Sequence, residues 1–184
     1  MTGTTTRNLV CDYVSYCIQQ SGKEWKDCPP LPTPGKVQRT LRVLGTEFEQ
    51  RYREIFSDMC NQLHITPSTA LPTFTGIVNE LFNDGVKWGR IVALFSFGGR
   101  LAVQYVDSDE PPRVTDIVQW VTDYVDQHLY SWIEEHGGWD GMVNFFEGNP
   151  DSKESPWPPL KKICSYAIGA VGVLTLGAIL AQRT

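Results

Sequence analysis

The chain of 184 residues has little positive charge and few of the residue clusters on which metal or redox chemistry depends. Its formal net charge is -5, its isoelectric point is about 5.2, and it contains no basic stripe, which argues against non-specific nucleic-acid binding. The five cysteines are odd in number and include no Cys-x-x-Cys pair, so we expect neither a metal cluster nor a redox motif. Free thiols in a reducing compartment are the simpler interpretation.

Sequence motifs for catalysis are also missing. The three histidines, His64, His128 and His136, are far apart, and none belongs to a His-Glu-x-x-His pattern. There is no Gly-x-Ser-x-Gly motif, phosphate-binding loop or dinucleotide fingerprint. Glu134 and Glu135 adjoin His136, but neighbouring residues on a helix point in different directions, which is typical of a solvated face. We therefore expect no enzyme, no catalytic residue, no metal and no cofactor.

The two ends of the chain differ in character. The first ten residues lack the charged start and the long apolar stretch of a secretory signal, so we expect a cytosolic chain. Ile163–Ala181, in contrast, runs for nineteen residues without a charge, and as a helix it would span about 28 Å, close to the thickness of a bilayer core. The run predicts a C-terminal membrane anchor that is inserted after translation. A buried core helix is the alternative.

Apolar residues recur at helical spacing in segments that proline and glycine separate. One segment, Gly89–Val106, is apolar on nearly all sides, which predicts a central buried helix. No segment shows convincing strand alternation. The pattern predicts an all-α bundle of about seven or eight helices, with helical segments at 7–22, 36–63, around 74–81, 89–106, 112–129 and 139–146.

Three local details and a domain plan follow from the same pattern. Gly45 inside a helix costs about 1 kcal/mol against alanine, so we expect something to pack tightly against it. Ser68 or Thr69 is expected to cap the helix that follows, and Pro112 suits a first helical position. The predicted plan is a helical domain at 1–147 with a short proline-rich loop at 23–35, a linker at 148–162 and the anchor at 163–181.

Four segments together resemble the homology motifs of the Bcl-2 family. RNLVCDYVSYCIQQSG looks like the fourth motif, and LRVLGTEF at Leu41–Phe48 resembles the third. NELFNDGVKWGRIVALFSFGG at Asn79–Gly99 is very similar to the first, and SWIEEHGGWDGMVNFF at Ser131–Phe146 resembles the second. The order of the motifs and the apolar tail also match. The resemblance covers nearly the whole chain and is strongest to the pro-survival branch, in particular to Bcl-xL and Bcl-w.

This resemblance implies a fold, a function and a location. The fold is a bundle around a central hydrophobic hairpin, here 89–106 and 112–129. A surface groove receives amphipathic death-motif helices of pro-apoptotic relatives, of the Bax/Bak effector type and of the Bim, Bad or Bid type, and so blocks permeabilisation of the mitochondrial outer membrane. The protein would sit on that membrane facing the cytosol, with endoplasmic-reticulum and cytosolic pools and homo- or heterodimers left open. A pore-forming Bax/Bak-type effector and a tail-anchored adaptor without a groove are the alternatives.

The resemblance also implies which residues form the groove. Arg90 would pair with an aspartate of the incoming helix, and Gly89 would allow close approach of that helix. For Arg90 the alternative is an internal salt bridge to Glu47 or Glu80, and for each apolar residue it is plain core packing. The other expected groove residues are Phe48, Tyr52, Phe56 and Met59 on one wall, Leu81, Val92, Ala93 and Phe97 on the floor, Phe146 at one end, and Glu80, Asp84, Lys87 and Trp88 around Arg90.

Two residues depart from the family pattern. Lys87 stands where an asparagine usually precedes the tryptophan of the first motif, and lysine would offer charge on a flexible stem instead of an amide. Thr46 replaces the acidic residue that usually follows the glycine of the third motif. The first departure puts selectivity among partners in doubt. The second favours a role as receptor of death-motif helices over a pro-death role.

Overall fold

The computed structural model describes residues 5–55, 57, 66–148 and 157–158 of the chain. Within these ranges all regular elements are helical, as predicted, and no strand occurs. The elements are α1 (Thr6–Gln20), α2 (Lys36–Arg51), α4 (Ala70–Leu81), α5 (Trp88–Tyr105), α6 (Val114–Tyr124), the π-helix η1 (Val125–Leu129), α7 (Tyr130–Glu135) and α8 (Gly138–Gly148).

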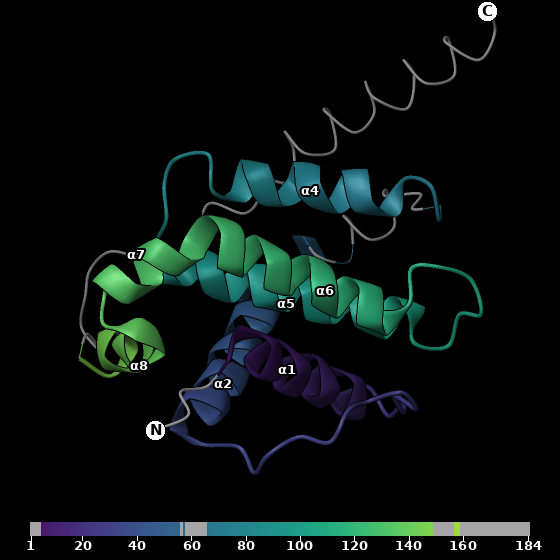
Figure 1. Cartoon of the computed structure of the whole chain (residues 1–184), viewed down its shortest axis with the longest axis horizontal. Helices are drawn as coiled ribbons and strands as arrows, with labels where there is room; N and C mark the ends of the chain where they lie inside the picture. The colour runs from purple at the N-terminus through teal and green to yellow at the C-terminus, as the bar shows by residue number, and fades with distance from the viewer. Residues whose placement is uncertain (1–4, 56, 58–65, 149–156, 159–184) are drawn as a thin grey trace, which may run out of the picture.

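The antiparallel pair of α5 and α6 runs through the middle of the molecule (Figure 1). The helix α4 covers one side of this pair, α1 and α2 pack on the other, and α7 and α8 close one end. The central position of α5 follows from its composition, because Ile91, Val92 and Leu94 have no exposed surface and point in different directions around the helix. The predicted central helix is therefore confirmed, shifted by one residue at each end.

Gly45 lies at the crossing of three helices. A Cβ atom at this position would collide with the hydroxyl of Tyr13 on α1. The Tyr13 hydroxyl in turn lies 3.3 Å from Oγ of Ser96 on α5, and its ring meets the Phe95 ring edge-on at 5.9 Å. The tight packing expected at Gly45 is confirmed: the missing side chain lets α2 approach α1 closely.

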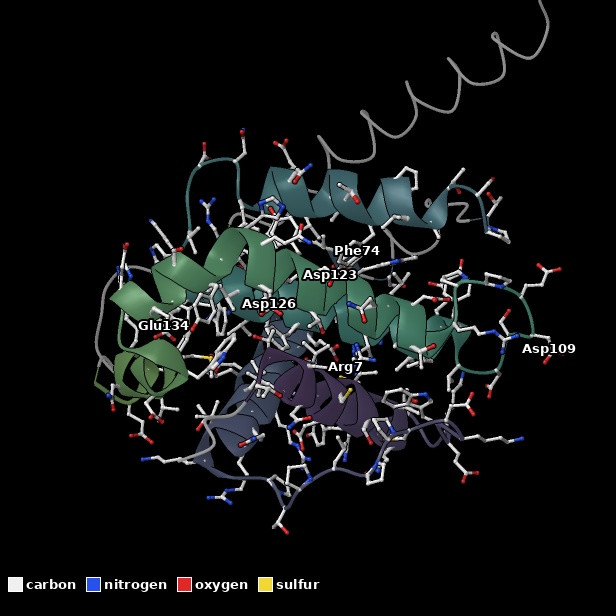
Figure 2. All side chains as sticks on the ribbon, viewed as in Figure 1. Arg7, Phe74, Asp109, Asp123, Asp126 and Glu134 are labelled. Atoms are coloured by element: carbon white, nitrogen blue, oxygen red, sulfur yellow. The ribbon has the colours of Figure 1, made fainter. Side chains whose placement is uncertain are left out.

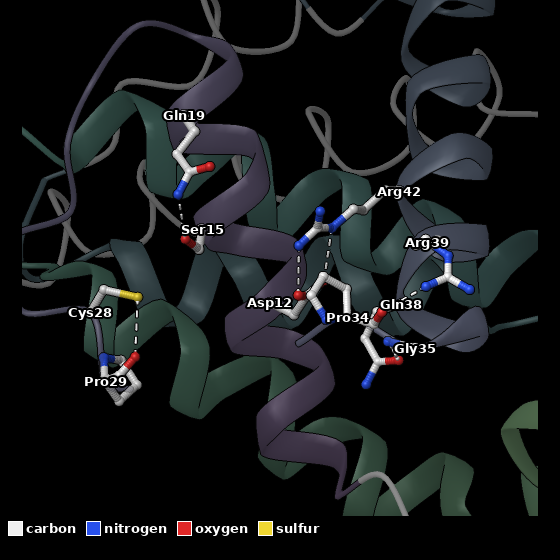
Figure 3. Close-up of polar contacts among 10 residues, drawn as sticks. All are labelled: Asp12, Ser15, Gln19, Cys28, Pro29, Pro34, Gly35, Gln38, Arg39 and Arg42. Carbon is white, nitrogen blue, oxygen red and sulfur yellow. Dashed lines mark hydrogen bonds and ion pairs between the residues drawn. The ribbon is translucent and has the colours of Figure 1, made fainter. Parts of the chain in front are cut away.

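A charged pair also joins α1 to α2. Arg42 donates from Nη2 to Oδ1 of Asp12 at 2.7 Å and from Nε to Oδ2 at 3.0 Å, and the Asp12 side chain is buried (Figure 3). The same guanidinium lies 5.0 Å from the ring centre of Tyr16. Two parallel charge-assisted bonds fix both distance and orientation, so this pair holds α2 in register on α1.

The helix expected over 36–63 is regular up to Arg51, a turn at Tyr52 (φ -116°, ψ 23°) interrupts it, and residues 53–55 and 57 are helical again. Its predicted end at residue 63 lies outside the described ranges. Two predicted helix starts need correction. Pro112 lies outside α6, because Arg113 is the N-cap and its N–H bonds Oδ2 of Asp116 at 2.9 Å. Thr69 is the N-cap of α4, but its hydroxyl accepts from the N–H of Thr66 and not from the helix.

None of the described helices has both the length and the apolar character needed to cross a membrane. The predicted anchor, 163–181, lies outside the described ranges, as does most of the predicted linker.

Candidate functional site

Arg90 is the one charged residue in the first two turns of α5, and it is buried, with 8% of its surface exposed. Its Nη1 donates to the carbonyl of Leu81 at 3.1 Å and, at the limit of a hydrogen bond, to that of Gly85 at 3.5 Å. No carboxylate of the described residues lies within ion-pair distance, so the alternative of a salt bridge to Glu47 or Glu80 is not realised there. Carbonyls orient the guanidinium without neutralising its charge.

The chain between α4 and α5 brings these carbonyls to Arg90. Leu81 is the last residue of α4. The last carbonyls of a helix have no partner within the helix and carry partial negative charge, which favours a cation nearby. Gly85 then turns the chain with φ +109°, a backbone conformation that residues with a side chain rarely adopt. Lys87 is the N-cap of α5, and its carbonyl accepts from the N–H groups of Arg90 and Ile91. Asp84 and Lys87 are exposed beside Arg90, where a ligand could meet both charges.

Trp88 serves the packing of the bundle. It is buried, with its ring 4.9 Å from that of Trp132 on α7 and 6.3 Å from that of Trp139 on α8. We therefore assign Trp88 to the core between α5, α7 and α8. Gly89, next to it, is also buried, in the first turn of α5.

The predicted wall and end of the groove meet in an aromatic cluster formed by Phe48, Tyr52, Phe146 and Trp157. The rings of Phe48 and Tyr52 lie 4.9 Å apart. The ring of Trp157 lies 5.6 Å from Phe48 and stacks at 5.6 Å on Phe146. The Tyr52 hydroxyl donates to the carbonyl of Pro158 at 3.3 Å. The chain beyond α8 thus returns to the surface that the sequence predicts for a ligand.

Trp157 is absent from the residues predicted from the sequence. It stands in the polar, proline-containing linker, and the structure leaves only 7% of its surface exposed. A large aromatic side chain in an otherwise polar linker was the available signal, because such a residue gains most by packing onto an apolar surface.

The predicted floor residues are covered in this conformation. Leu81, Val92, Ala93 and Phe97 are all buried. The ring of Phe97 stacks on that of Phe74 of α4 at 5.7 Å, and the Phe74 ring also lies 5.7 Å from that of Trp120 of α6. Phe74 is labelled between α4 and α6 in Figure 2. Glu80 is half-buried on α4. Among the described residues, the Phe74 ring lies against Phe97, so a ligand side chain that enters beside Phe97 would meet Phe74 first.

The structure brings two sets of the predicted site residues together, apart from the buried floor and Trp88. Arg90 and Leu81 meet where α4 ends and α5 begins, and Phe48, Tyr52 and Phe146 meet in the aromatic cluster. Phe56 and Met59 lie outside the described residues. In the part of the chain that the structure describes, no group of three or more metal-ligating side chains occurs.

Comparisons with known proteins point to one family. A family model described as apoptosis regulator proteins of the Bcl-2 family matches residues 41–139. The apoptosis regulator Bcl-2 of Canis lupus familiaris is 35% identical, over 99% of this chain and 98% of its own length. Bcl-2-like protein 1 of Rattus norvegicus is 53% identical, over 80% of this chain and 64% of its own length.

A solved structure supports the same assignment. The crystal structure of Trichoplax adhaerens trBcl-2L2 bound to trBak BH3 superposes with a TM-score of 0.69 at 37% sequence identity. The match covers 77% of this chain and 96% of that chain. The likeness confirms the helical bundle predicted for the described part of the chain.

Proposed function

Because this chain belongs to the Bcl-2 family of apoptosis regulators, we propose that it is an anti-apoptotic member. It captures the amphipathic death-motif helices of pro-apoptotic relatives in a hydrophobic groove and so blocks permeabilisation of the mitochondrial outer membrane. It acts by binding and not by catalysis. Bcl-2 and Bcl-2-like protein 1 are the relatives that support this assignment, and the solved relative is bound to a Bak BH3 segment.

The observation that carries the proposal is the state of Arg90. Its charge is buried at the edge of an apolar floor, it is held by carbonyls, and no described carboxylate neutralises it. An acidic residue on an incoming helix would complete the pair while the apolar side chains of the same helix enter the floor. Removing one member of such a desolvated pair typically costs about 2–5 kcal/mol.

Titration calorimetry with a death-motif helix of the Bak type tests the proposal. We expect Arg90→Ala to weaken binding at least about tenfold. Arg39→Ala is the matched control, because Arg39 is exposed on α2 and its guanidinium donates to the Pro34 carbonyl. Circular dichroism verifies that both variants fold. An affinity of Arg90→Ala equal to that of the parent would refute the assignment of Arg90.

A change in the peptide separates charge pairing from the loss of the Arg90 carbonyl bonds. Replacing the peptide's aspartate by asparagine should weaken binding to the parent chain and have little further effect on Arg90→Ala, since the two residues act as one pair. Release of a dye from liposomes gives a second readout: an anti-apoptotic chain blocks release by an activated effector, whereas an effector causes it.

The same proposal extends to the rest of the chain. Residues 1–147 form the helical domain, 148–162 form a linker, and Ile163–Ala181 anchor the chain in the mitochondrial outer membrane with the domain facing the cytosol. The uncharged run of nineteen residues supports this plan. We expect that removal of residues 163–184 shifts the protein from alkali-resistant membranes to the soluble fraction. Unchanged membrane association would argue against the anchor.

A further inference from the structure

A polar trough lies on the side of α2 away from Phe48. Three stripes of side chains with helical spacing face it: positions 46, 49, 50 and 53 on and just after α2, positions 13, 16, 17 and 20 on α1, and positions 100 and 103 on α5. The trough consists of two adjoining hollows of about 160 and 220 Å³ that share Thr46, Glu49 and Arg100. Together they reach the lower end of the size range of small-ligand sites, about 300–1,000 Å³.

The charges that line the trough are not paired with one another. Arg100 on α5 faces Glu49 across it, and Arg53 follows Glu49 by four residues on the α2 side, yet within the described ranges none of these three side chains forms a hydrogen bond or an ion pair. About two turns before Glu49 on α2, Arg42 makes two bonds to Asp12, so the packing of α1 against α2 does allow close pairs. The trough carries a net charge of about +1 in a protein whose own net charge is -5.

The α1 side of the trough is partly apolar, with Gln20 and Ser21 as its polar residues. The Tyr16 and Cys17 side chains line it, and burial raises the pKa of the Cys17 thiol to about 12, so the thiol is neutral at physiological pH. Val103 on α5 extends this apolar side. The trough therefore offers one guanidinium group from Arg53 beside α2 and one from Arg100 on α5, next to an apolar surface formed by Tyr16, Cys17 and Val103.

We propose that the polar trough binds a small organic monoanion, with its carboxylate on Arg100 and Arg53 and its apolar body against Tyr16, Cys17 and Val103. A guanidinium matches a carboxylate in geometry, with two parallel hydrogen bonds. A single negative charge neutralises the trough, whereas a phosphate dianion would leave an excess of negative charge beside Glu49. This inference is independent of the groove, which lies on the other side of α2.

Fluorine NMR of 4-fluorophenylacetate added to the full chain tests the proposal, with 4-fluorophenylacetamide as the uncharged probe of the same size. We expect saturable binding of the carboxylate, binding of the amide at least about fivefold weaker, and a loss of about fivefold in Arg100→Gln. Arg39→Ala, which changes an arginine of α2 outside the trough, should leave binding unchanged. Glu49→Gln should tighten binding, because it removes the one negative charge in the trough.

Amide chemical shifts locate the probe. Shifts that gather at Tyr16, Thr46 and Val103 support the trough. Equal binding of the two probes, an unchanged affinity in Arg100→Gln, or shifts that gather at Arg90 and the aromatic cluster would overturn the proposal. A failure of the groove experiment leaves this result unaffected, because Arg90→Ala leaves the trough intact.

Discussion

At the scale of single residues, glycine and arginine differ in how much of their role the sequence reveals. A glycine inside a helical pattern is locally unfavourable, so close packing at Gly45 could be predicted before the partner was known. The sequence did not identify Tyr13 as that partner, because the contact depends on how α1 crosses α2. For Arg90 the sequence predicted a need for a partner. It could not indicate the carbonyls of Leu81 and Gly85, which backbone geometry brings near.

Gly45→Ala tests the crossing of α1 and α2. The added methyl group meets the buried Tyr13 ring, so the free energy of unfolding should fall by about 1–3 kcal/mol, as for other overpacked cores. Gly76→Ala is the control, because a Cβ atom there meets nothing within 4 Å, and it should raise the same free energy by up to about 1 kcal/mol. Urea unfolding measures both. Equal effects of the two substitutions would contradict the packing role of Gly45.

At the scale of elements, helical periodicity predicted where helices lie better than where they end. The apolar spacing that predicts a helix to residue 129 continues through η1 into α7, because a π-helix keeps the same face buried with Val125 and Leu129. The φ angle that proline imposes suits the first residue of a helix. The Asp116 side chain, however, accepts from the N–H of Arg113, and this bond makes Arg113 the N-cap. The return of Trp157 to Phe48 could not be predicted, since it depends on the path of a linker.

Trp157 occupies the aromatic cluster to which the sequence assigns a ligand role. Its ring would have to leave before a ligand side chain entered between Phe48 and Phe146, and this equilibrium lowers the apparent affinity. We expect Trp157→Ala to bind a death-motif helix about threefold or more tightly. Trp25→Ala, a change in the 23–35 loop, should have no effect in the same calorimetric titration. Weaker binding by Trp157→Ala would show instead that Trp157 forms part of the ligand's contact surface.

At the scale of the whole molecule, buried groups beside the α1–α5 contact link stability to pH. Burial raises the pKa of the Cys17 thiol from 9.0 to about 12, and burial also raises the pKa of the neighbouring Tyr13 hydroxyl. The folded chain therefore keeps a proton on Cys17 that the unfolded chain releases above pH 9. Where the folded chain binds one proton more than the unfolded chain, the free energy of unfolding falls by about 1.4 kcal/mol for each pH unit. The contribution of Cys17 to stability is therefore fully present below pH 9 and is lost as the pH rises toward 12.

Cys17→Ala separates this thiol from the other groups that titrate at alkaline pH. Urea unfolding of the parent chain between pH 8 and about 11 should lose stability more steeply than the variant, by the slope of about one proton above pH 9. Cys28→Ala, in the 23–35 loop, is the control and should keep the slope of the parent. If Cys17→Ala also keeps that slope, the thiol titrates alike in the folded and unfolded chains. The trough beside it would then be too well hydrated to hold Cys17 neutral at high pH, and the apolar wall inferred for its α1 side would be lost.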